Sequence, residues 1–204
     1  MYPVIKWDAY FLNIAQAIKL RSSCIRRQVG AVVTKDNRLL ATGYNGTPKG
    51  ITNCNEGGCP RCNSDAPSGT ALEDCICVHA EQNAIVQAAR YGIRIEGADM
   101  YCTLFPCKDC AKLIINAGIV RVVVGSDHYN KKVMNDAMNL LADADVTIQI
   151  GDTPKPIVFG PGNTGKRYTG FKLDPQDFVI TAVKRKPLIG RKRKTYLDKL
   201  MRHG

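Results

Sequence analysis

The sequence predicts an α/β protein built on a mixed sheet with helices packed on both faces. A β-hairpin pattern near the start is followed by strands that alternate with helices. The 204 residues suffice for one sizeable core, and 45% of them are apolar. Neither a signal-peptide core nor a membrane-spanning apolar run stands at the beginning, so we expect a cytoplasmic or otherwise intracellular protein.

The first predicted elements are a helix and a hairpin. Apolar residues recur at helical spacing over 7–20, which predicts an amphipathic helix. Two β-rich runs at 29–34 and 38–44, separated by three polar residues, predict the hairpin. The segment 45–78 has no sustained periodicity and is long for a structureless loop, so we expect a staple to hold it together.

The second half of the sheet unit predicts alternating helices and strands. Gly92 and Gly118 end the first two of these helices, as glycine commonly does. The predicted elements are helix 79–92, strand 99–105, helix 106–118, strand 120–125, a helix near 131–142 and a strand near 145–150. Helices that follow neighbouring parallel strands begin at the carboxyl edge of the sheet, where ligands of open α/β sheets bind.

The positive charge is concentrated at the end of the chain. Residues 1–150 contain 16 Lys and Arg against 14 Asp and Glu, whereas residues 151–204 contain 13 against 4. We therefore expect a domain over 1–150 and a basic C-terminal extension of unknown role over 151–204.

A histidine, a glutamate and two cysteines form the strongest motif. His79-Ala80-Glu81 is followed 25 residues later by Pro106 and the pair Cys107 and Cys110. This spacing matches the H-x-E and P-C-x-x-C signature of zinc deaminases. The two cysteines lie one helical turn apart, at a helix start that favours thiolates. With His79 they predict a three-ligand catalytic zinc whose fourth position is open.

Glu81 is predicted to be the catalytic proton shuttle. It lies two residues after His79 and so points elsewhere on the helix, beside the metal-bound water. It would take the proton of that water and return it through N3 and the leaving amine of a pyrimidine, while hydroxide attacks C4. Taken alone, Cys-x-x-Cys is also consistent with a redox pair or half a structural zinc site.

Segments beyond these residues resemble the deoxycytidylate deaminases over about residues 5–150. The matching segments are RSSC at 21–24, Arg26, VGAVV at 29–33, GYNGTPKG at 43–50, HAEQNAI at 79–85, YCTLFPCKDCAKLIINAGI at 101–119 and SDHY at 126–129. The resemblance implies the cytidine deaminase fold with a five-stranded mixed sheet and hydrolytic deamination of dCMP to dUMP and ammonia, which would supply thymidylate synthesis.

The resemblance also implies regulation and particular substrate contacts. It implies a homo-oligomer, often a hexamer, activated by dCTP with Mg²⁺ and inhibited by dTTP. Asn45 matches a position that binds the deoxyribose, and Arg26 and Tyr129 match positions near the phosphate; Ala80 completes the expected substrate site. Each of these three residues also has a structural alternative. Asn45 could serve a turn, Arg26 could be a solvated surface charge, and Tyr129 could be a packing residue.

Six further cysteines indicate a second zinc. Nine cysteines are unlikely to form disulfides in a reducing compartment, and a structural zinc needs four. By the resemblance, Cys24, Cys54, Cys59 and Cys75 stand at the family's second zinc. The spacing before His79 differs, so Cys62, which forms its own Cys-x-x-Cys with Cys59, and Cys77 are alternatives.

The end of the chain leaves other functions open. Residues 151–170 are rich in Pro and Gly and predict a linker, 171–186 end in a β-like run, and 184–194 carry seven basic residues. The basic run suits a solvated tail, an arm on an acidic neighbouring subunit, or a nuclear-import or nucleic-acid patch. The rival functions are therefore a nucleic-acid deaminase, which shares the signature, and a non-enzymatic zinc-stabilised nucleotide-binding protein.

Overall fold

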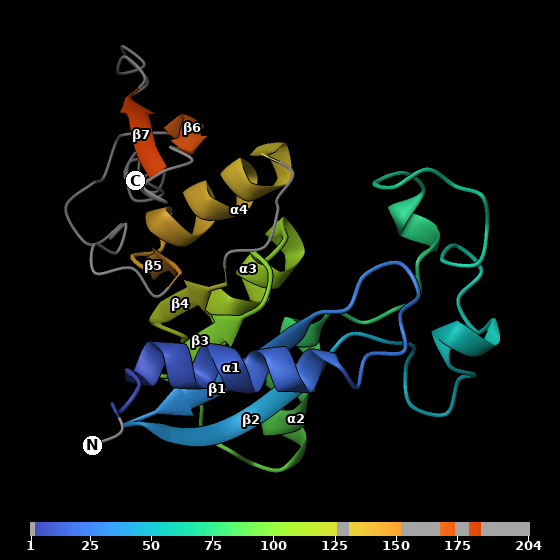
Figure 1. Cartoon of the computed structure of the whole chain (residues 1–204), viewed down its shortest axis with the longest axis horizontal. Coiled ribbons are helices and arrows are strands. Elements are labelled where there is room, and N and C mark those ends of the chain that lie inside the picture. The colour runs from blue at the N-terminus through green and yellow to red at the C-terminus, as the bar shows by residue number, and fades with distance from the viewer. Residues whose placement is uncertain (1–2, 126–130, 152–167, 174–179, 185–204) are drawn as a thin grey trace, which may run out of the picture.

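A five-stranded mixed sheet forms the centre of the protein (Figure 1). The structure is a computed structural model, and it describes residues 3–125, 131–151, 168–173 and 180–184. The sheet has the order β2-β1-β3-β4-β5, with β1 antiparallel to β2 and β3 and the last three strands parallel. The strands are β1 (Gly30–Lys35), β2 (Arg38–Tyr44), β3 (Asp99–Cys102), β4 (Arg121–Val124) and β5 (Thr147–Ile150).

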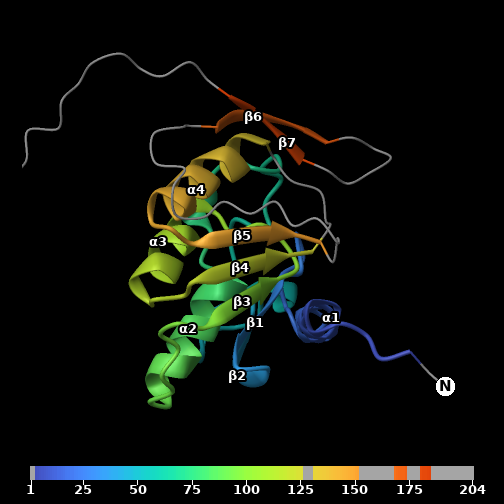
Figure 2. The ribbon, with the colours of Figure 1, turned by 90° about the vertical axis from the view of Figure 1, so that its left-hand side faces the viewer.

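Helices cover both faces of this sheet (Figure 2). One face carries α1 (Trp7–Lys19), and the other carries α2 (Ala80–Arg90), α3 (Lys108–Asn116) and α4 (Lys131–Asp143). Each of these helices and strands lies where the sequence predicts one. The predicted architecture, a five-stranded mixed sheet with helices on both faces, is confirmed.

Alternation along the strands divides the core between the two faces. Val32, Tyr101 and Val123 are register partners, and they pack with Phe11 and Ala15 of α1. Their neighbours along the strands belong to the larger core under α2, α3 and α4. This period of two is what a sheet covered on both sides requires, and it explains why the central strands read as continuous apolar runs.

A polar cluster joins α1 to three strands. Asp8 accepts hydrogen bonds from Arg121 at 2.6 Å, from the Tyr101 hydroxyl at 2.8 Å and from Gln149 at 2.9 Å. Arg121 also donates to Asp99 at 3.0 Å. Burial opposes ionisation of Asp8, but the hydrogen bonds from Arg121, Tyr101 and Gln149 outweigh it and lower its pKa.

We expect Asp8→Asn to destabilise the fold by about 2 kcal/mol at pH 7, because it leaves Arg121 partly buried with one partner fewer. A lowered folded pKa means that the carboxylate stabilises the fold above its unfolded pKa of about 4, and that this contribution is lost as the pH falls through the folded value. The free energies of unfolding of the wild type and of Asp8→Asn, measured with urea, should therefore converge under acid conditions. Asp65→Asn, at an exposed loop residue, is the control. An equal effect of both substitutions would contradict the assignment.

The segment 45–78 leaves the sheet and returns to nearly the same point. It contains two short 3₁₀ turns, Cys54–Glu56 and Leu72–Asp74, and it extends away from the body of the sheet in Figure 1. Gly46 and Val78 pair as a β-bridge, with N–H···O distances of 3.2 and 2.8 Å. The ends of the segment are thus held together where β2 ends and α2 begins.

The described parts of the C-terminal extension are two paired strands. β6 (Tyr168–Leu173) is antiparallel to β7 (Ile180–Lys184), and β7 falls in the predicted β-like run. β6 has no counterpart in the sequence prediction. Most of the predicted linker and the basic run after Lys184 lie outside the described residues, so the boundary at residue 150 and the role of the extension stay predictions. No helix in the described part of the chain has both the length and the apolar composition needed to span a membrane.

Candidate active site

The two predicted motifs meet at one edge of the sheet. β1 is antiparallel to both β2 and β3, so β2 and β3 run in the same direction and their carboxyl ends share an edge. α2 and α3 begin at this edge, where His79 is the N-cap of α2 and Cys107 the N-cap of α3. Cys110 follows in the first turn of α3. The nitrogen of His79 and the sulfurs of Cys107 and Cys110 all lie within 4.8 Å of one another.

This geometry fits a tetrahedral metal ion. Nδ1 of His79 lies 3.3 Å from Sγ of Cys110 and 3.4 Å from Sγ of Cys107. A zinc ion with Zn–N near 2.0 Å and Zn–S near 2.3 Å needs N···S separations of about 3.5 Å. Three protein ligands leave one position for water or substrate, as in catalytic zinc sites. The structure therefore brings all three predicted ligands together.

The protonation of Cys107 suits a metal, whereas His79 would have to release a proton to bind one. The hydrogen bond from the Cys110 thiol lowers the pKa of Cys107 to about 4, helped by His79 and opposed by burial. The hydrogen bond to Cys107 in turn raises the pKa of His79 to about 9. Cys107 is thus a thiolate at neutral pH, which is the form that binds a metal.

Glu81 lies beside the ligands and is enclosed by protein. Glu81 is 4% exposed, and its carboxylate is not part of the group that the ligand atoms of His79, Cys107 and Cys110 form. Burial raises the pKa of its carboxyl group, because the charged form is poorly solvated there. A carboxyl group with a raised pKa next to a metal position can both accept and return a proton.

A capping contact missed by the sequence prediction fixes the start of α2. The side-chain oxygen of Gln82 accepts a hydrogen bond from the backbone N–H of His79 at 3.0 Å. The neighbouring Asn83 donates to the Tyr44 carbonyl at the end of β2, at 2.7 Å. Glutamine three residues after the N-cap is a capping-box signal, so HAEQ already carried this information.

Gly43 permits α2 to approach β2 closely. A Cβ at this position would lie 2.1 Å from the Ala80 carbonyl oxygen and 2.5 Å from the Ala84 nitrogen. Both are helix backbone atoms, so they cannot rotate away. The fully buried Ala80, predicted to be a substrate contact, therefore has its carbonyl against the sheet.

We expect Gly43→Ala to cost about 3 kcal/mol and to lower turnover roughly a hundredfold, since α2 must shift with His79 and Glu81. Thermal unfolding and steady-state kinetics measure the two effects. Thr42→Ala, next in the same strand and facing the opposite side, is the control. Wild-type stability in Gly43→Ala would show that the helix has room to move.

Asn45 is engaged by the chain itself. Its Oδ1 accepts hydrogen bonds from Ser22 Oγ at 2.8 Å and the Val29 N–H at 2.7 Å, and its Nδ2 donates to the Arg27 carbonyl at 2.7 Å. Through these hydrogen bonds, Asn45 fixes the segment after α1 against the end of β2. Among the described residues, the Nδ2 group has one acceptor, the Arg27 carbonyl, and the deoxyribose contact stays a prediction.

Arg26 and Tyr129 do not complete a phosphate site in the described structure. The Arg26 guanidinium donates to the carbonyl oxygens of Cys62, at 2.7 Å, and Ser64, so it is turned toward the 45–78 loop. Tyr129 and the rest of the SDHY segment lie outside the described residues. Both phosphate contacts stay predictions.

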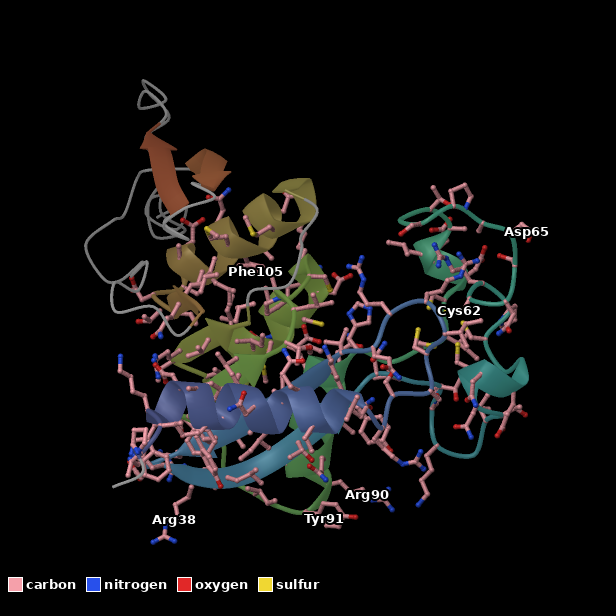
Figure 3. The ribbon with its side chains drawn as sticks, viewed as in Figure 1. Arg38, Cys62, Asp65, Arg90, Tyr91 and Phe105 are labelled. Carbon is pink, nitrogen blue, oxygen red and sulfur yellow. The ribbon has the colours of Figure 1, made fainter. Side chains whose placement is uncertain are left out.

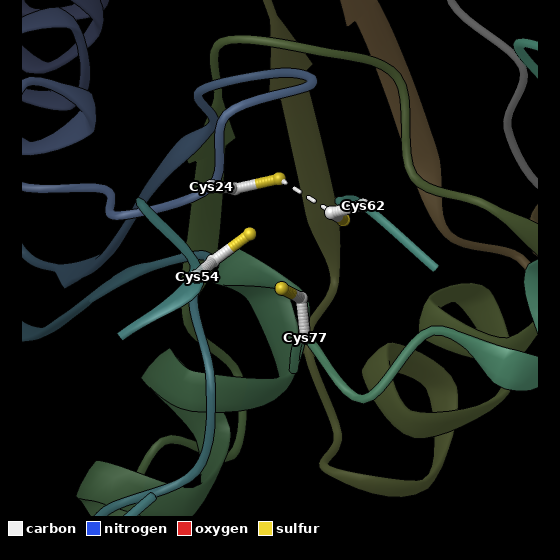
Figure 4. Close-up of side chains that lie close together, drawn as sticks. All are labelled: Cys24, Cys54, Cys62 and Cys77. Carbon is white, nitrogen blue, oxygen red and sulfur yellow. Dashed lines mark hydrogen bonds between the residues drawn. The ribbon is translucent and has the colours of Figure 1, made fainter. Parts of the chain in front are cut away.

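Six of the other seven cysteines form a second cluster, to which the 45–78 loop contributes five and the segment after α1 contributes Cys24; the seventh, Cys102, lies in β3. Figure 3 shows the labelled Cys62 in this loop, away from Phe105 in the main core. Two sets of four have all their sulfurs within 4.8 Å of one another: Cys24, Cys54, Cys62 and Cys77, drawn in Figure 4, and Cys59, Cys62, Cys75 and Cys77. The predicted set of Cys24, Cys54, Cys59 and Cys75 is not one of them. The alternatives Cys62 and Cys77 belong to both.

Thiolate character is present in this cluster as well. Burial opposes it at Cys59, but the backbone amides of Cys62 and Ile76 and the neighbouring thiols of Cys62 and Cys75 lower the pKa of Cys59 to about 6. The cysteines of the cluster are free thiols. The sequence could show that six cysteines were available, but their grouping depends on the path of an irregular loop.

The fold and the site together define a class of protein. A mixed α/β sheet whose helices begin at His-x-Glu and Cys-x-x-Cys segments is the arrangement of zinc-dependent nucleobase deaminases. A family model described as "Cytidine and deoxycytidylate deaminase zinc-binding region" matches residues 5–126. The chain belongs to this family.

Individual relatives agree with the family match. Deoxycytidylate deaminase of Schizosaccharomyces pombe is 42% identical over 75% of this chain, and that of Saccharomyces cerevisiae 39% identical over 76%. The matched regions are 46% and 49% of those two proteins, so the chain spans about half the length of these curated relatives. The dCMP deaminase of cyanophage S-TIM5, solved in complex with dCMP and dUMP, is 32% identical with a TM-score of 0.58, covering 73% of this chain and 99% of that one.

Proposed function

We propose that this chain hydrolyses dCMP to dUMP and ammonia. The observation that carries the proposal is the convergence of His79, Cys107 and Cys110 around one tetrahedral position, with buried Glu81 beside it. Support for the nucleotide comes from the S-TIM5 enzyme, whose structure contains both dCMP and dUMP and which aligns over nearly its whole length. The family match covers the residues that form the site.

The roles of the residues follow from their positions. When bound at the three ligands, zinc supplies a Lewis acid that lowers the pKa of water toward neutrality. Glu81 accepts a proton from the attacking water, whose oxygen bonds to C4 of the pyrimidine, and passes the proton to N3. The C4–N bond then breaks, and the amine leaves as ammonia after Glu81 transfers the second proton of the water to it. His79, Cys107 and Cys110 would hold the metal, and the burial of Glu81, which is 4% exposed, keeps bulk water away from its carboxyl group.

The proposal extends to regulation and assembly by resemblance to deoxycytidylate deaminases. We propose activation by dCTP with Mg²⁺, inhibition by dTTP, a homo-oligomer such as a hexamer, an intracellular location and supply of dUMP for thymidylate synthesis. A second, structural zinc would hold the 45–78 loop. Asn45, Arg26, Ala80 and Tyr129 are the proposed substrate contacts; within the part of the chain that the structure describes, the Asn45 amide has a second hydrogen available for this role.

A substrate panel tests the proposal. Zinc-loaded protein is incubated with cytidine, CMP, dCMP, dCTP and single-stranded DNA, each with and without dCTP as effector, and ammonia release is measured. We expect turnover of dCMP that dCTP increases. Deamination of single-stranded DNA without turnover of dCMP would favour the nucleic-acid deaminase. Binding of dCTP without any turnover, over a range of Mg²⁺ concentrations, would favour the non-enzymatic nucleotide-binding protein.

A further inference from the structure

The two sets of four cysteines overlap in a particular way. Cys62 and Cys77 belong to both sets. Cys24 and Cys54 complete only the first set, and Cys59 and Cys75 only the second. Among the described residues, no set combines a member of the outer pair Cys24 and Cys54 with a member of the outer pair Cys59 and Cys75. Six thiols thus surround two neighbouring positions that share one edge.

The measured sulfur separations match zinc coordination at both positions. A tetrahedral zinc with Zn–S bonds of about 2.3 Å requires S···S separations of about 3.8 Å. Cys62 Sγ lies 3.9 Å from Cys24 Sγ in the first set and 3.8 Å from Cys75 Sγ in the second, and Cys59 Sγ lies 3.8 Å from Cys75 Sγ. A disulfide would need about 2.0 Å, and all six cysteines are free. The Cys62 sulfur therefore lies at the separation expected for two ligands of one zinc ion both from Cys24, in one outer pair, and from Cys75, in the other.

We propose that the six cysteines hold a binuclear zinc–thiolate cluster, in which Cys62 and Cys77 bridge two zinc ions. Cys24 and Cys54 complete the tetrahedron of one ion, and Cys59 and Cys75 complete that of the other. A single ion would use only one set and leave an outer pair unbound. Sharing two thiolates gives both ions four sulfur ligands from six cysteines.

Backbone donors support the outer ligands of both ions. The backbone amides of Arg26 and Arg27 donate hydrogen bonds to the Cys24 sulfur. Those of Cys62 and Ile76 donate to the Cys59 sulfur. One outer cysteine of each pair therefore already receives two N–H groups, which stabilise the excess negative charge of a terminal thiolate.

A buried arginine complements the charge of the cluster. Two Zn²⁺ ions and six thiolates carry a net charge of −2. Arg61, between Cys59 and Cys62 in the chain, is 6% exposed, and its guanidinium donates to the carbonyl oxygens of Pro67 and Thr70. Within the described ranges no carboxylate forms an ion pair with it. A buried cation without a carboxylate partner is costly unless another anion lies nearby, and a cluster on Cys59 and Cys62 would supply such an anion close to Arg61 in the chain.

The cluster would also position the active site. Cys24 follows α1, and Cys77 comes two residues before His79, next to the bridge between Val78 and Gly46. The cluster would therefore connect the end of α1 to the segment that contains His79, the first of the three catalytic metal ligands. Its existence does not depend on which nucleotide is the substrate.

¹¹³Cd NMR of the full chain tests the proposal without any substitution. Zinc is exchanged for ¹¹³Cd, and metal content is counted on the zinc form by mass spectrometry. We expect three metal ions per chain and three ¹¹³Cd resonances, of which two have all-sulfur chemical shifts and are split by scalar coupling through the bridging sulfurs. The third, from His79, Cys107 and Cys110, should be unsplit. Two ions per chain, or two all-sulfur resonances without coupling, would overturn the proposal.

A pair of cysteine variants locates the second ion. Cys75→Ala should abolish the metal–metal coupling and lower the zinc content, because an outer ligand is lost. Cys102→Ala removes a buried thiol from β3, outside both sets, and should keep three ions and the coupling. Retention of coupled resonances in Cys75→Ala would contradict the assignment of the outer pair. The wild-type spectrum decides the proposal even if this variant fails to fold.

Discussion

Glu81→Gln should lose nearly all turnover of dCMP while keeping its zinc. The amide has the size of the carboxyl group and leaves His79, Cys107 and Cys110 untouched, but it cannot accept a proton from water. General acid–base catalysis contributes about 10²- to 10⁴-fold, and one group that serves several proton transfers lies at the upper end of this range. We therefore expect kcat to fall by about 10³-fold or more, with the KM for dCMP changed far less.

The matched control is Glu73→Gln, the same substitution at an exposed glutamate in the 45–78 loop. It should leave kcat, metal content and thermal stability unchanged. Zinc is counted in each purified variant, so loss of the metal and loss of the proton carrier are distinguished. A Glu81→Gln protein with wild-type kcat would refute the proton-shuttle mechanism.

Cys107→Ser should remove the catalytic metal without unfolding the protein. Serine is a favourable N-cap residue, so α3 keeps its first turn, but the thiolate that binds the metal is lost. Without the metal the reaction loses several kcal/mol of transition-state stabilisation, and about 4 kcal/mol corresponds to roughly a thousandfold in rate. Metal content should fall by one ion per chain, and the melting temperature should change by only a few degrees.

Cys102→Ala provides the comparison for this variant, because Cys102 is buried next to the site but belongs to no ligand group. It should keep its metal and most of its activity. Added zinc should not restore turnover to Cys107→Ser, whereas it should restore wild-type protein stripped with a chelator. Full activity in metal-depleted Cys107→Ser would show that the reaction runs elsewhere.

The residues of the candidate metal site could be grouped from the sequence because each half of the motif is a local pattern. Cys107 and Cys110 lie one turn apart, and His79 begins a helix whose position follows from the strand order. The alternating strands and helices were likewise local patterns. The structure places each α-helix and strand over 7–150 within a few residues of its predicted range.

Contacts that depend on distant segments were not predictable in the same way. The cluster of Asp8, Tyr101, Arg121 and Gln149 joins residues up to 141 positions apart, and no local pattern marks it. Arg26 reads as a phosphate ligand from its type and motif, but in the structure it donates to carbonyl oxygens of a loop without periodicity. The grouping of the six cysteines in the second cluster could not be predicted for the same reason, since the path of an irregular loop decides which sulfurs meet.

The bridge between Gly46 and Val78 has a consequence for how this part of the protein can change over evolution. Because both ends of the segment are held at one point, the number of residues between them does not set the position of β2 or α2. Lengthening such a closed excursion is cheap, at about 0.6 kcal/mol for each doubling of its length. Insertions and deletions can therefore accumulate there while the catalytic edge stays in register, so the cysteine-rich segment and the deaminase core are free to diverge at different rates.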